Sequence, residues 1–445
     1  MINKRDLELL KAALEKLEEG ESGLPEFTPA FDEEAASDVL SRVAKRMQNN
    51  YPYYHPQYAG QMLKPPHPVA RMAYALSLWV NPNNHALDGG RASSAMEKEC
   101  IVELGRMFGW DAPLGHLAGG GTMANLEALW VSGRLHPGKR VIASEQAHYT
   151  HSRITEVLGI PFAAVDVDER GRIDIAAIES QLAKGDVGTV VVTIGSTGLG
   201  ALDPLPAILD LRTKYEFRIH ADAAYGGYFG LASELDEPSR SVFDALGEVD
   251  SIVIDPHKHG LQPYGCGCVM FRDPSVGALF KHDSPYTYFS SGDLQLGENT
   301  LECSRPGASA VALWATQQLL PLVRGGEFAA QLDACLRAAR MFWHNLHNSS
   351  TFTPLMQPEL DIVVYVVNAA TTSESSTKAR QVFVEAAKRE LHLALVELPV
   401  DVVSRYAPEI EVDSETVTCL RSVLMKPEHE NWLERITALL EASAQ

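Results

Sequence analysis

The chain has 445 residues, 45% of them hydrophobic, and its 58 Asp and Glu against 38 Lys and Arg give a formal net charge of −20. This length predicts more than one structural unit, and the negative charge opposes binding to nucleic acid or to anionic membranes. No segment offers the roughly 18 apolar residues of a membrane span or the apolar core of a signal peptide. We therefore expect a cytoplasmic protein with no membrane or nucleic-acid partner.

Residues 1–60 form a predicted N-terminal segment. Its first part reads as an amphipathic helix with leucines on one stripe and charges around them. Its last part is the aromatic and proline-rich stretch YPYYHPQYAG.

From about residue 90 to 275, helical patterns alternate with short β-branched runs, which is typical of a doubly wound sheet with helices on both faces. The run 268–271 follows the preceding strand too closely for a crossover helix, so we expect it to be antiparallel to that strand or an edge of the sheet. Predicted strands are 140–143, 162–165, 189–194, 217–220, 251–254 and 268–271, and predicted helices are 125–134, 153–158, 175–183 and 206–215.

After a stretch with Pro306 and Gly307, a long helical pattern runs from 309 to about 346. Alternating strand and helix patterns then predict a smaller α/β domain, in which TTSESSTK, 371–378, is an expected exposed loop. Its predicted strands are 361–367 and 416–425, and its predicted helices are 377–391 and 430–443. The expected units are an N-terminal segment (1–60), a large domain (61–315) and a small C-terminal domain (316–445).

The six cysteines are scattered, and a chain of this length needs no disulfide framework. Cys266 and Cys268 lack the two-residue spacer and the second pair of a zinc site. We expect reduced thiols and no metal.

A glycine-rich turn, Gly119-Gly120-Gly121-Thr122, precedes the predicted helix 125–134. Glycines let the backbone approach an anion, and the N–H groups at a helix start favour a phosphate there. The alternative interpretation of these residues is a tight turn before a helix, with no bound anion. The stretch lacks the Gly-x-Gly-x-x-Gly and P-loop patterns, which argues against dinucleotides and nucleoside triphosphates.

Three further residues follow predicted strands directly: Asp222 in IHAD, Lys258 in DPHKHG and His148 in SEQAHYT. Considered alone, Asp222 is typical of a helix N-cap and Lys258 of a solvated surface lysine. His148 alone is typical of a loop histidine whose hydrogen bonds are made locally. Ligands gather beyond the carboxyl ends of strands in open α/β sheets. A phosphate cradle, a carboxylate and a lysine at such ends are what pyridoxal phosphate requires: an anchor, a partner for the pyridinium nitrogen and a Schiff-base amine.

The stretches DPHKHG, HADAAYGG, GGGTMANLEAL and QAHYTHSR, in their positions along the chain, resemble the group II pyridoxal-phosphate-dependent amino-acid decarboxylases of the aspartate aminotransferase superfamily. The resemblance covers about residues 50 to 430. It implies a fold type I architecture: a large domain with a mostly parallel seven-stranded sheet between helices, plus a small C-terminal α/β domain. It also implies pyridoxal 5'-phosphate as cofactor and a homodimer with shared active sites.

Carried across residue by residue, the resemblance implies that Lys258 forms the internal aldimine. Asp222 would pair with the pyridine nitrogen, and His148 would cover one face of the ring. The remaining cofactor residues would be Ala224 under the other face, Gly121 and Thr122 at the phosphate, His257 close to it, and Thr197 facing the cofactor.

On the substrate side, the resemblance makes Arg421 the anchor of the α-carboxylate, and the alternative is a structural arginine on an exposed edge. His55, in YPYYHPQYAG, would lie at the substrate entrance. Tyr288 aligns with the tyrosine that reprotonates the substrate carbon, and Tyr286 is close enough to compete for that role. Arg305 would be structural or on the phosphate side.

The expected reaction is decarboxylation of an L-amino acid to its amine and CO2. Alternatives that keep the cofactor are an aldehyde lyase and an aldehyde-forming oxidative decarboxylase. An alternative of another class is a metal protein built on His257, His259 and the neighbouring cysteines. His259 departs from the tryptophan or tyrosine that follows the lysine in the family.

The sequence does not decide whether the substrate has an aromatic or an acidic side chain. The aromatic N-terminal stretch favours an aromatic one. Lys64, Arg71 or Arg91 could serve a distal carboxylate.

Overall fold

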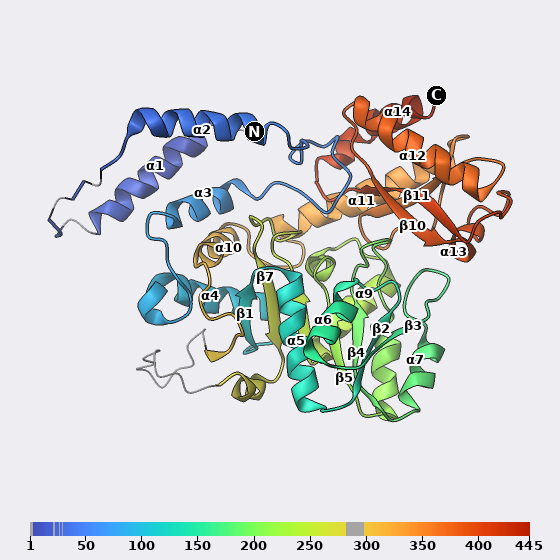
Figure 1. Cartoon of the computed structure of the whole chain (residues 1–445), viewed down its shortest axis with the longest axis horizontal. Helices are drawn as coiled ribbons and strands as arrows, with labels where there is room; N and C mark the ends of the chain where they lie inside the picture. The colour runs from blue at the N-terminus through green and yellow to red at the C-terminus, as the bar shows by residue number, and fades with distance from the viewer. Residues whose placement is uncertain (1–2, 21–22, 26, 29, 282–297) are drawn as a thin grey trace.

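The computed structural model describes residues 3–20, 23–25, 27–28, 30–281 and 298–445. Its main feature is a seven-stranded sheet in the order β1-β7-β6-β5-β4-β2-β3 (Figure 1). β7 is antiparallel to both of its neighbours, whereas the remaining strands run in one direction. The strands are β1 (Leu114–Ala118), β2 (Arg140–Ser144), β3 (Phe162–Val165), β4 (Val187–Thr193), β5 (Arg218–Asp222), β6 (Ser251–Ile254) and β7 (Gly267–Phe271).

Helices cover both faces of this sheet, which explains why its central strands are continuous apolar runs. In β4, Val190 and Val192 belong to one core and Val191 to another. Ile154 of α6 packs with Val191, and Ile208 of α8 packs with the opposite core. One face carries α5 (Gly121–Leu135) and α6 (Thr150–Leu158), and the other carries α4 (Leu87–Met107), α7 (Ile175–Leu182), α8 (Leu205–Asp210), α9 (Glu237–Asp244) and α10 (Ala308–Leu319). The predicted doubly wound sheet is confirmed.

The predicted antiparallel direction of 268–271 is also confirmed, because β7 pairs antiparallel with β6. β7 is not an edge strand, however, since β1 pairs with its other side. The sequence patterns missed β1 because LGHLA contains no β-branched residue and strands favour such residues.

A second, four-stranded sheet follows in the order β10-β11-β9-β8, with every pair antiparallel. We call this sheet with its covering helices the C-terminal unit (Figure 1). Its elements are β8 (Phe352–Pro354), β9 (Ile362–Val367), β10 (Ala394–Pro399) and β11 (Thr416–Val423), with α11 (Glu327–His347), α12 (Thr372–Lys388), α13 (Val400–Ser404) and α14 (His429–Ser443). The division of the chain at residues 60 and 315 stays a prediction.

Two expectations for this half of the chain are wrong. The helical pattern 309–346 is two helices, α10 and α11, because Pro321 interrupts it and Gly325 adopts a left-handed φ of 73°. The expected loop 371–378 is the start of α12. Thr371 caps this helix by accepting a hydrogen bond from the Glu374 N–H at 3.3 Å, as Ser and Thr commonly do at helix starts.

The N-terminal helices α1 (Lys4–Glu19) and α2 (Glu33–Met47) project from one end of the molecule (Figure 1). Neither contains a buried residue. α3 (Pro68–Ser77) follows and packs against α10. Within the described residues, no helix combines the length and the apolar character needed to cross a bilayer.

Candidate active site

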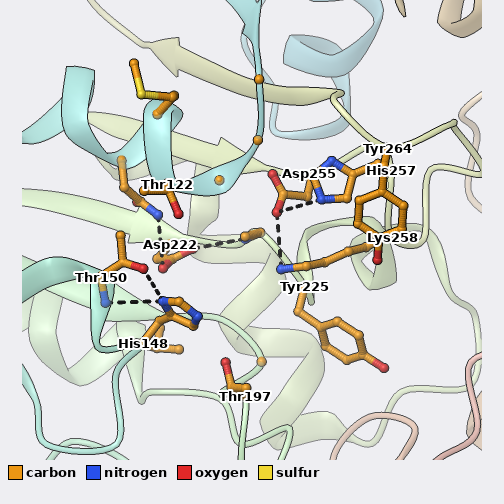
Figure 2. Close-up of a pocket in the computed structure, with 18 residues that line it drawn as sticks. Thr122, His148, Thr150, Thr197, Asp222, Tyr225, Asp255, His257, Lys258 and Tyr264 are labelled. Atoms are coloured by element: carbon orange, nitrogen blue, oxygen red, sulfur yellow. Dashed lines mark hydrogen bonds and ion pairs between the residues drawn. The ribbon is translucent and has the colours of Figure 1, made fainter. Parts of the chain in front are cut away.

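A cavity of about 370 Å³ lies beyond the carboxyl ends of the parallel strands. Residues at the ends of four strands and at the start of one helix line this cavity. Asp222 ends β5 and Thr193 ends β4. His148 follows β2, Lys258 follows β6, and Gly121 begins α5. Figure 2 shows Asp222, His148 and Lys258 pointing into this space from different sides. The doubly wound topology therefore brings segments far apart in the sequence to one site.

All the residues predicted to contact the cofactor line this cavity: Gly121, Thr122, His148, Thr197, Asp222, Ala224, His257 and Lys258. Arg421 and His55 do not belong to its lining. Tyr286 and Tyr288 lie outside the described residues.

Asp222 is a buried carboxylate, 6% exposed, held by three donors. Its Oδ2 lies 2.8 Å from Nε2 of His151 and 3.3 Å from Nδ2 of Asn125, and its Oδ1 accepts the Ala224 N–H at 3.2 Å. Burial alone would raise the pKa of Asp222, but the hydrogen bond and charge of His151, with the charge of Lys258, hold that pKa well below its usual range. Asp222 is therefore ionised at neutral pH.

Sequence reasoning missed the residues behind Asp222. His220 places Nε2 2.7 Å from Oδ1 of Asn125 and Nδ1 2.9 Å from Oγ of Ser251. Burial lowers the pKa of His220 to about 3, so its imidazole is neutral and donates to Asn125. A continuous chain of hydrogen bonds thus fixes the Asn125 amide, whose N–H groups point at Asp222. One signal was present: His151 lies three residues after His148, a spacing that puts both on one side of a helix start.

Lys258 forms an ion pair with Asp255 in this structure. Its Nζ is 3.2 Å from Oδ2 of Asp255, and Nε2 of His257 is 3.5 Å from the same oxygen. Burial lowers the pKa of His257, a shift that Asp255 opposes, so the imidazole is neutral near pH 7. Asp255 is 3% exposed, and sequence reasoning did not single it out although it opens DPHKHG.

The glycine turn has the shape of an anion cradle. Gly120 is the N-cap of α5 and supplies no side-chain cap, so the first N–H groups of the helix stay available. A Cβ at Gly121 would lie 2.8 Å from Oδ2 of Asp255, so only glycine leaves this approach open. The residues present therefore fit a phosphate-bearing cofactor: an uncapped helix start, a lysine and an ionised carboxylate share one cavity.

His148 is half-buried at the start of α6, where its Nδ1 accepts the Thr150 N–H at 3.2 Å. Burial lowers its pKa. Its ring stacks on Tyr149 at 4.5 Å between centroids, and its Nδ1 also contacts Oγ1 of Thr150. This fixed, neutral imidazole presents a flat face to the cavity.

The substrate-side candidates Arg421 and His55 lie outside the lining of the cavity. Arg421, in β11, is 5% exposed and donates from Nη1 to the Thr197 carbonyl at 2.8 Å and from Nη2 to Oε1 of Gln61 at 3.2 Å. His55 packs edge-on against Trp432 at 4.9 Å. Their roles in substrate binding stay predictions.

Arg305 occupies a structural position. Its Nη1 lies 2.7 Å from Oε1 of Glu97, and the same atom contacts the carbonyl oxygen of Leu117. It does not line the main cavity.

The basic residues considered for a distal carboxylate lie elsewhere. Arg71 pairs with Asp6 of α1 at 3.2 Å, and Arg91 is exposed on α4. Burial lowers the pKa of Lys64, an effect that nearby Asp361 partly offsets. In the described part of the chain, Lys258 is the only lysine or arginine in the lining of the cavity.

The metal alternative finds no support in the geometry. Cys266 and Cys268 are buried free thiols. Among the residues that the structure describes, no three His, Cys, Asp or Glu side chains gather as a metal site would need.

The fold and the cavity define an enzyme of the pyridoxal-phosphate-dependent fold type I class. A family model described as the pyridoxal-dependent decarboxylase conserved domain matches residues 130–368, more than half of the chain. The chain belongs to this family, and it is a pyridoxal-phosphate-dependent amino-acid decarboxylase.

Known proteins agree with this assignment. The chain is 28% identical over 358 residues to the L-aspartate decarboxylase of Thermococcus kodakarensis, covering 79% of this chain and 90% of that protein. It is 25% identical over 459 aligned positions to the L-tyrosine decarboxylase of Enterococcus faecium, covering 79% of this chain and 75% of that protein. Among solved structures, mouse CSAD in its apo form has a TM-score of 0.79 at 21% identity, covering 100% of this chain and 93% of that one, which supports the fold.

Proposed function

We propose that the chain converts an L-amino acid to its amine and CO2, with Lys258 as the lysine that holds the cofactor and Asp222 as the partner of its pyridine nitrogen. The observation that carries the proposal is the convergence of Lys258, Asp222 and the uncapped start of α5 in one cavity. When bound, pyridoxal phosphate supplies an electron sink for the pair left when the Cα–carboxylate bond breaks.

Four residues that line the cavity have proposed roles around the cofactor. Asp222, kept ionised by His151, would lie beside the pyridine nitrogen of the bound cofactor and would keep that nitrogen protonated. Lys258, which contacts Asp255 in this structure, would supply the amine that holds the cofactor and later releases the product. His148 and Ala224 line the cavity and would pack on the two faces of the cofactor ring.

Tyr288 is the proposed proton donor to the substrate carbon, with Tyr286 as its competitor. A phenol with a pKa of about 10 is a suitable acid toward a strongly basic carbon. Because both tyrosines lie outside the described residues, the proposal rests on the match of HDSPYTYFSSGD to the family's tyrosine-bearing stretch.

For the substrate, we infer an uncharged side chain. Lys258 alone among the lysines and arginines of the described chain lines the cavity, so its wall provides no spare cation for a distal carboxylate. L-Tyrosine and L-aspartate are the substrates to compare first, because curated relatives are named for them.

The active unit is a homodimer in this proposal. Large apolar side chains stand exposed on the projecting helices, with Leu40 65% and Met47 62% exposed. Trp79, just after α3, is 64% exposed. Apolar faces of this kind on a helix pair mark a surface that another molecule covers, and a second copy of the chain fits because both copies carry the same face.

The test is covalent trapping combined with product analysis. Borohydride treatment of the holoenzyme, followed by peptide mass spectrometry, should place the reduced cofactor on Lys258, and Lys258→Ala should abolish it. Lys214→Ala is the matched control, because Lys214 is an exposed lysine paired with Glu179 outside the cavity. An adduct on another lysine overturns the assignment.

The same preparation is then offered L-tyrosine, L-aspartate and the remaining amino acids. Amine and CO2 in equal amounts support decarboxylation. Aldehyde with ammonia and hydrogen peroxide, formed at the expense of oxygen, would instead identify the oxidative reaction.

A further inference from the structure

Three consecutive residues before β9, Glu359-Leu360-Asp361, dock the C-terminal unit onto the loops of the cavity. We call them the docking turn. Each of the three side chains is at most 8% exposed. Together they contact the loop after β4 and the segments that follow β5 and β6.

The first two residues reach the loop that carries Thr197. Oε2 of Glu359 accepts the Leu202 N–H at 2.7 Å. Leu360 packs so closely that its Cδ1 would lie 3.0 Å from a Cβ at Gly195, which itself lines the cavity. The backbone after β4 is therefore held against the C-terminal unit.

The third residue, Asp361, links the two segments that carry the proposed catalytic residues. Tyr225, three positions after Asp222, lines the cavity and donates its hydroxyl to Oδ1 of Asp361 at 2.5 Å. His259, directly after Lys258, places Nε2 3.2 Å from Oδ2 of Asp361, a close approach that does not meet hydrogen-bond geometry. Asp361 and His259 are 0% and 1% exposed.

Aromatic packing fixes His259 from two sides. Its ring meets the ring of Tyr225 at 4.9 Å and that of Phe229 at 4.8 Å, both nearly edge-on. Burial lowers the pKa of His259 although Asp361 opposes the shift, and burial raises the pKa of Tyr225 far above its usual value. Both groups are neutral near pH 7: Tyr225 donates its hydroxyl hydrogen to the buried carboxylate, and His259 packs beside it without adding a charge.

We propose that Asp361 is a positioning residue: through Tyr225 and His259 it sets the relative placement of the segments that carry Asp222 and Lys258. This inference rests on the proposed function, in which those two residues hold the cofactor. It also gives His259 a role, because the imidazole after the lysine faces a carboxylate of the C-terminal unit and does not face the cavity.

A purely structural network would behave differently from a positioning one. If the three side chains only contribute to folding, their loss lowers the melting temperature and leaves a folded holoenzyme with normal cofactor binding. If they set the placement of Lys258 and Asp222, their loss changes cofactor affinity and turnover in protein that is still folded, since small displacements of reacting groups cost large factors in rate.

Tyr225→Phe and Asp361→Asn are the test variants, and Tyr365→Phe is the matched control. Tyr365 is an equally buried tyrosine of the C-terminal unit whose hydroxyl lies 3.1 Å from Oγ of Ser422, away from the cavity. The readouts are pyridoxal phosphate affinity of the apoenzyme, the absorbance maximum of the bound cofactor, melting temperature, and kcat and KM for the best substrate.

We expect Tyr225→Phe and Asp361→Asn each to raise the cofactor's dissociation constant about tenfold and to shift its absorbance band, because the cofactor site is no longer preorganised. kcat should fall on the order of 10- to 100-fold, with KM changed less than about threefold. The double variant should lose no more than the worse single variant, because both substitutions break one unit. Tyr365→Phe should change only the melting temperature.

Wild-type affinity, spectrum and kcat in both variants would overturn the inference, as would losses that simply add in the double variant. Borohydride trapping of the wild type separates this failure from that of the proposed function. If wild-type protein carries the cofactor on Lys258 while the variants behave like Tyr365→Phe, only the role of Asp361 is refuted. If the wild type forms no such adduct, the proposed function itself fails.

Discussion

His151 controls the charge of Asp222, so replacing it should change both stability and pH dependence. In His151→Leu, Asp222 keeps the Ala224 N–H and the Asn125 amide but loses its 2.8 Å partner. The carboxylate then stays buried, and the contact that opposed its desolvation is gone.

Removing one partner of a buried charged pair costs about 3–5 kcal/mol. At 1.36 kcal/mol per pKa unit, this raises the folded-state pKa of Asp222 by about 2–4 units, from well below its usual range to or above the unfolded value near 3.9. In the wild type, the depressed pKa contributes stability that is present at neutral pH and is lost only as the pH falls through the folded-state pKa. In the variant, the raised pKa of Asp222 lowers the stability of the folded protein at neutral pH, and this loss of stability becomes smaller as the pH falls.

Urea unfolding of the apoenzymes at several pH values between 8 and 3 measures this difference. The variant should be about 3–5 kcal/mol less stable at pH 7–8, and the gap should narrow as the pH falls through the variant's raised pKa, close to the unfolded value of about 3.9. The acidic limb of its kcat/KM profile should move to higher pH. His151→Gln, which retains an N–H donor but carries no charge, should recover only the part of both effects that the hydrogen bond contributes. A gap that is independent of pH, or smaller than about 1 kcal/mol, would refute the assigned charge relation.

Three further predictions concern the cofactor site and the assembly. Asp222→Asn should keep the cofactor bound but lower kcat by about 10- to 100-fold, because an amide stabilises the pyridinium far less; stopped assays for CO2 check this, and near-normal turnover contradicts it. Gly121→Ala should weaken pyridoxal phosphate binding about tenfold, because its Cβ would lie 2.8 Å from Asp255, whereas Gly23→Ala, with open space around it, should bind normally. If the chain forms the proposed dimer, Leu40→Asp should convert it to a monomer in sedimentation velocity, and an unchanged sedimentation coefficient would exclude α2 from the interface.

The catalytic candidates were predictable because each depends on local sequence. Asp222, Lys258 and His148 follow strands that apolar runs mark clearly, and parallel strands bring their carboxyl ends to one edge. Once the strands are identified, their terminal residues are placed together without any knowledge of distant contacts. The cavity lining confirms that placement.

The supporting residues were not predictable in this way, because their partners lie far away in the sequence. Asp361 meets Tyr225 across 136 positions, and no periodicity links them. Local errors had a different cause: TTSESSTK has a loop composition, yet its Thr371 and Glu374 form a helix-capping pattern that composition conceals. Composition describes solvent exposure, whereas capping depends on the positions of a few hydrogen bonds.

His259 and Asp361 explain each other's presence. A carboxylate without access to solvent is unfavourable unless polar hydrogens surround it, and a fully buried imidazole is unfavourable unless an acceptor faces it. Tyr225 donates to Oδ1 of Asp361, and Nε2 of His259 lies 3.2 Å from Oδ2, an arrangement that holds only while the loop after β6 and the start of β9 stay together. The residue that departs from the family pattern beside Lys258 therefore faces the opposite unit of the molecule. If Asp361 positions these segments as proposed, the position of Lys258 depends on how that unit docks.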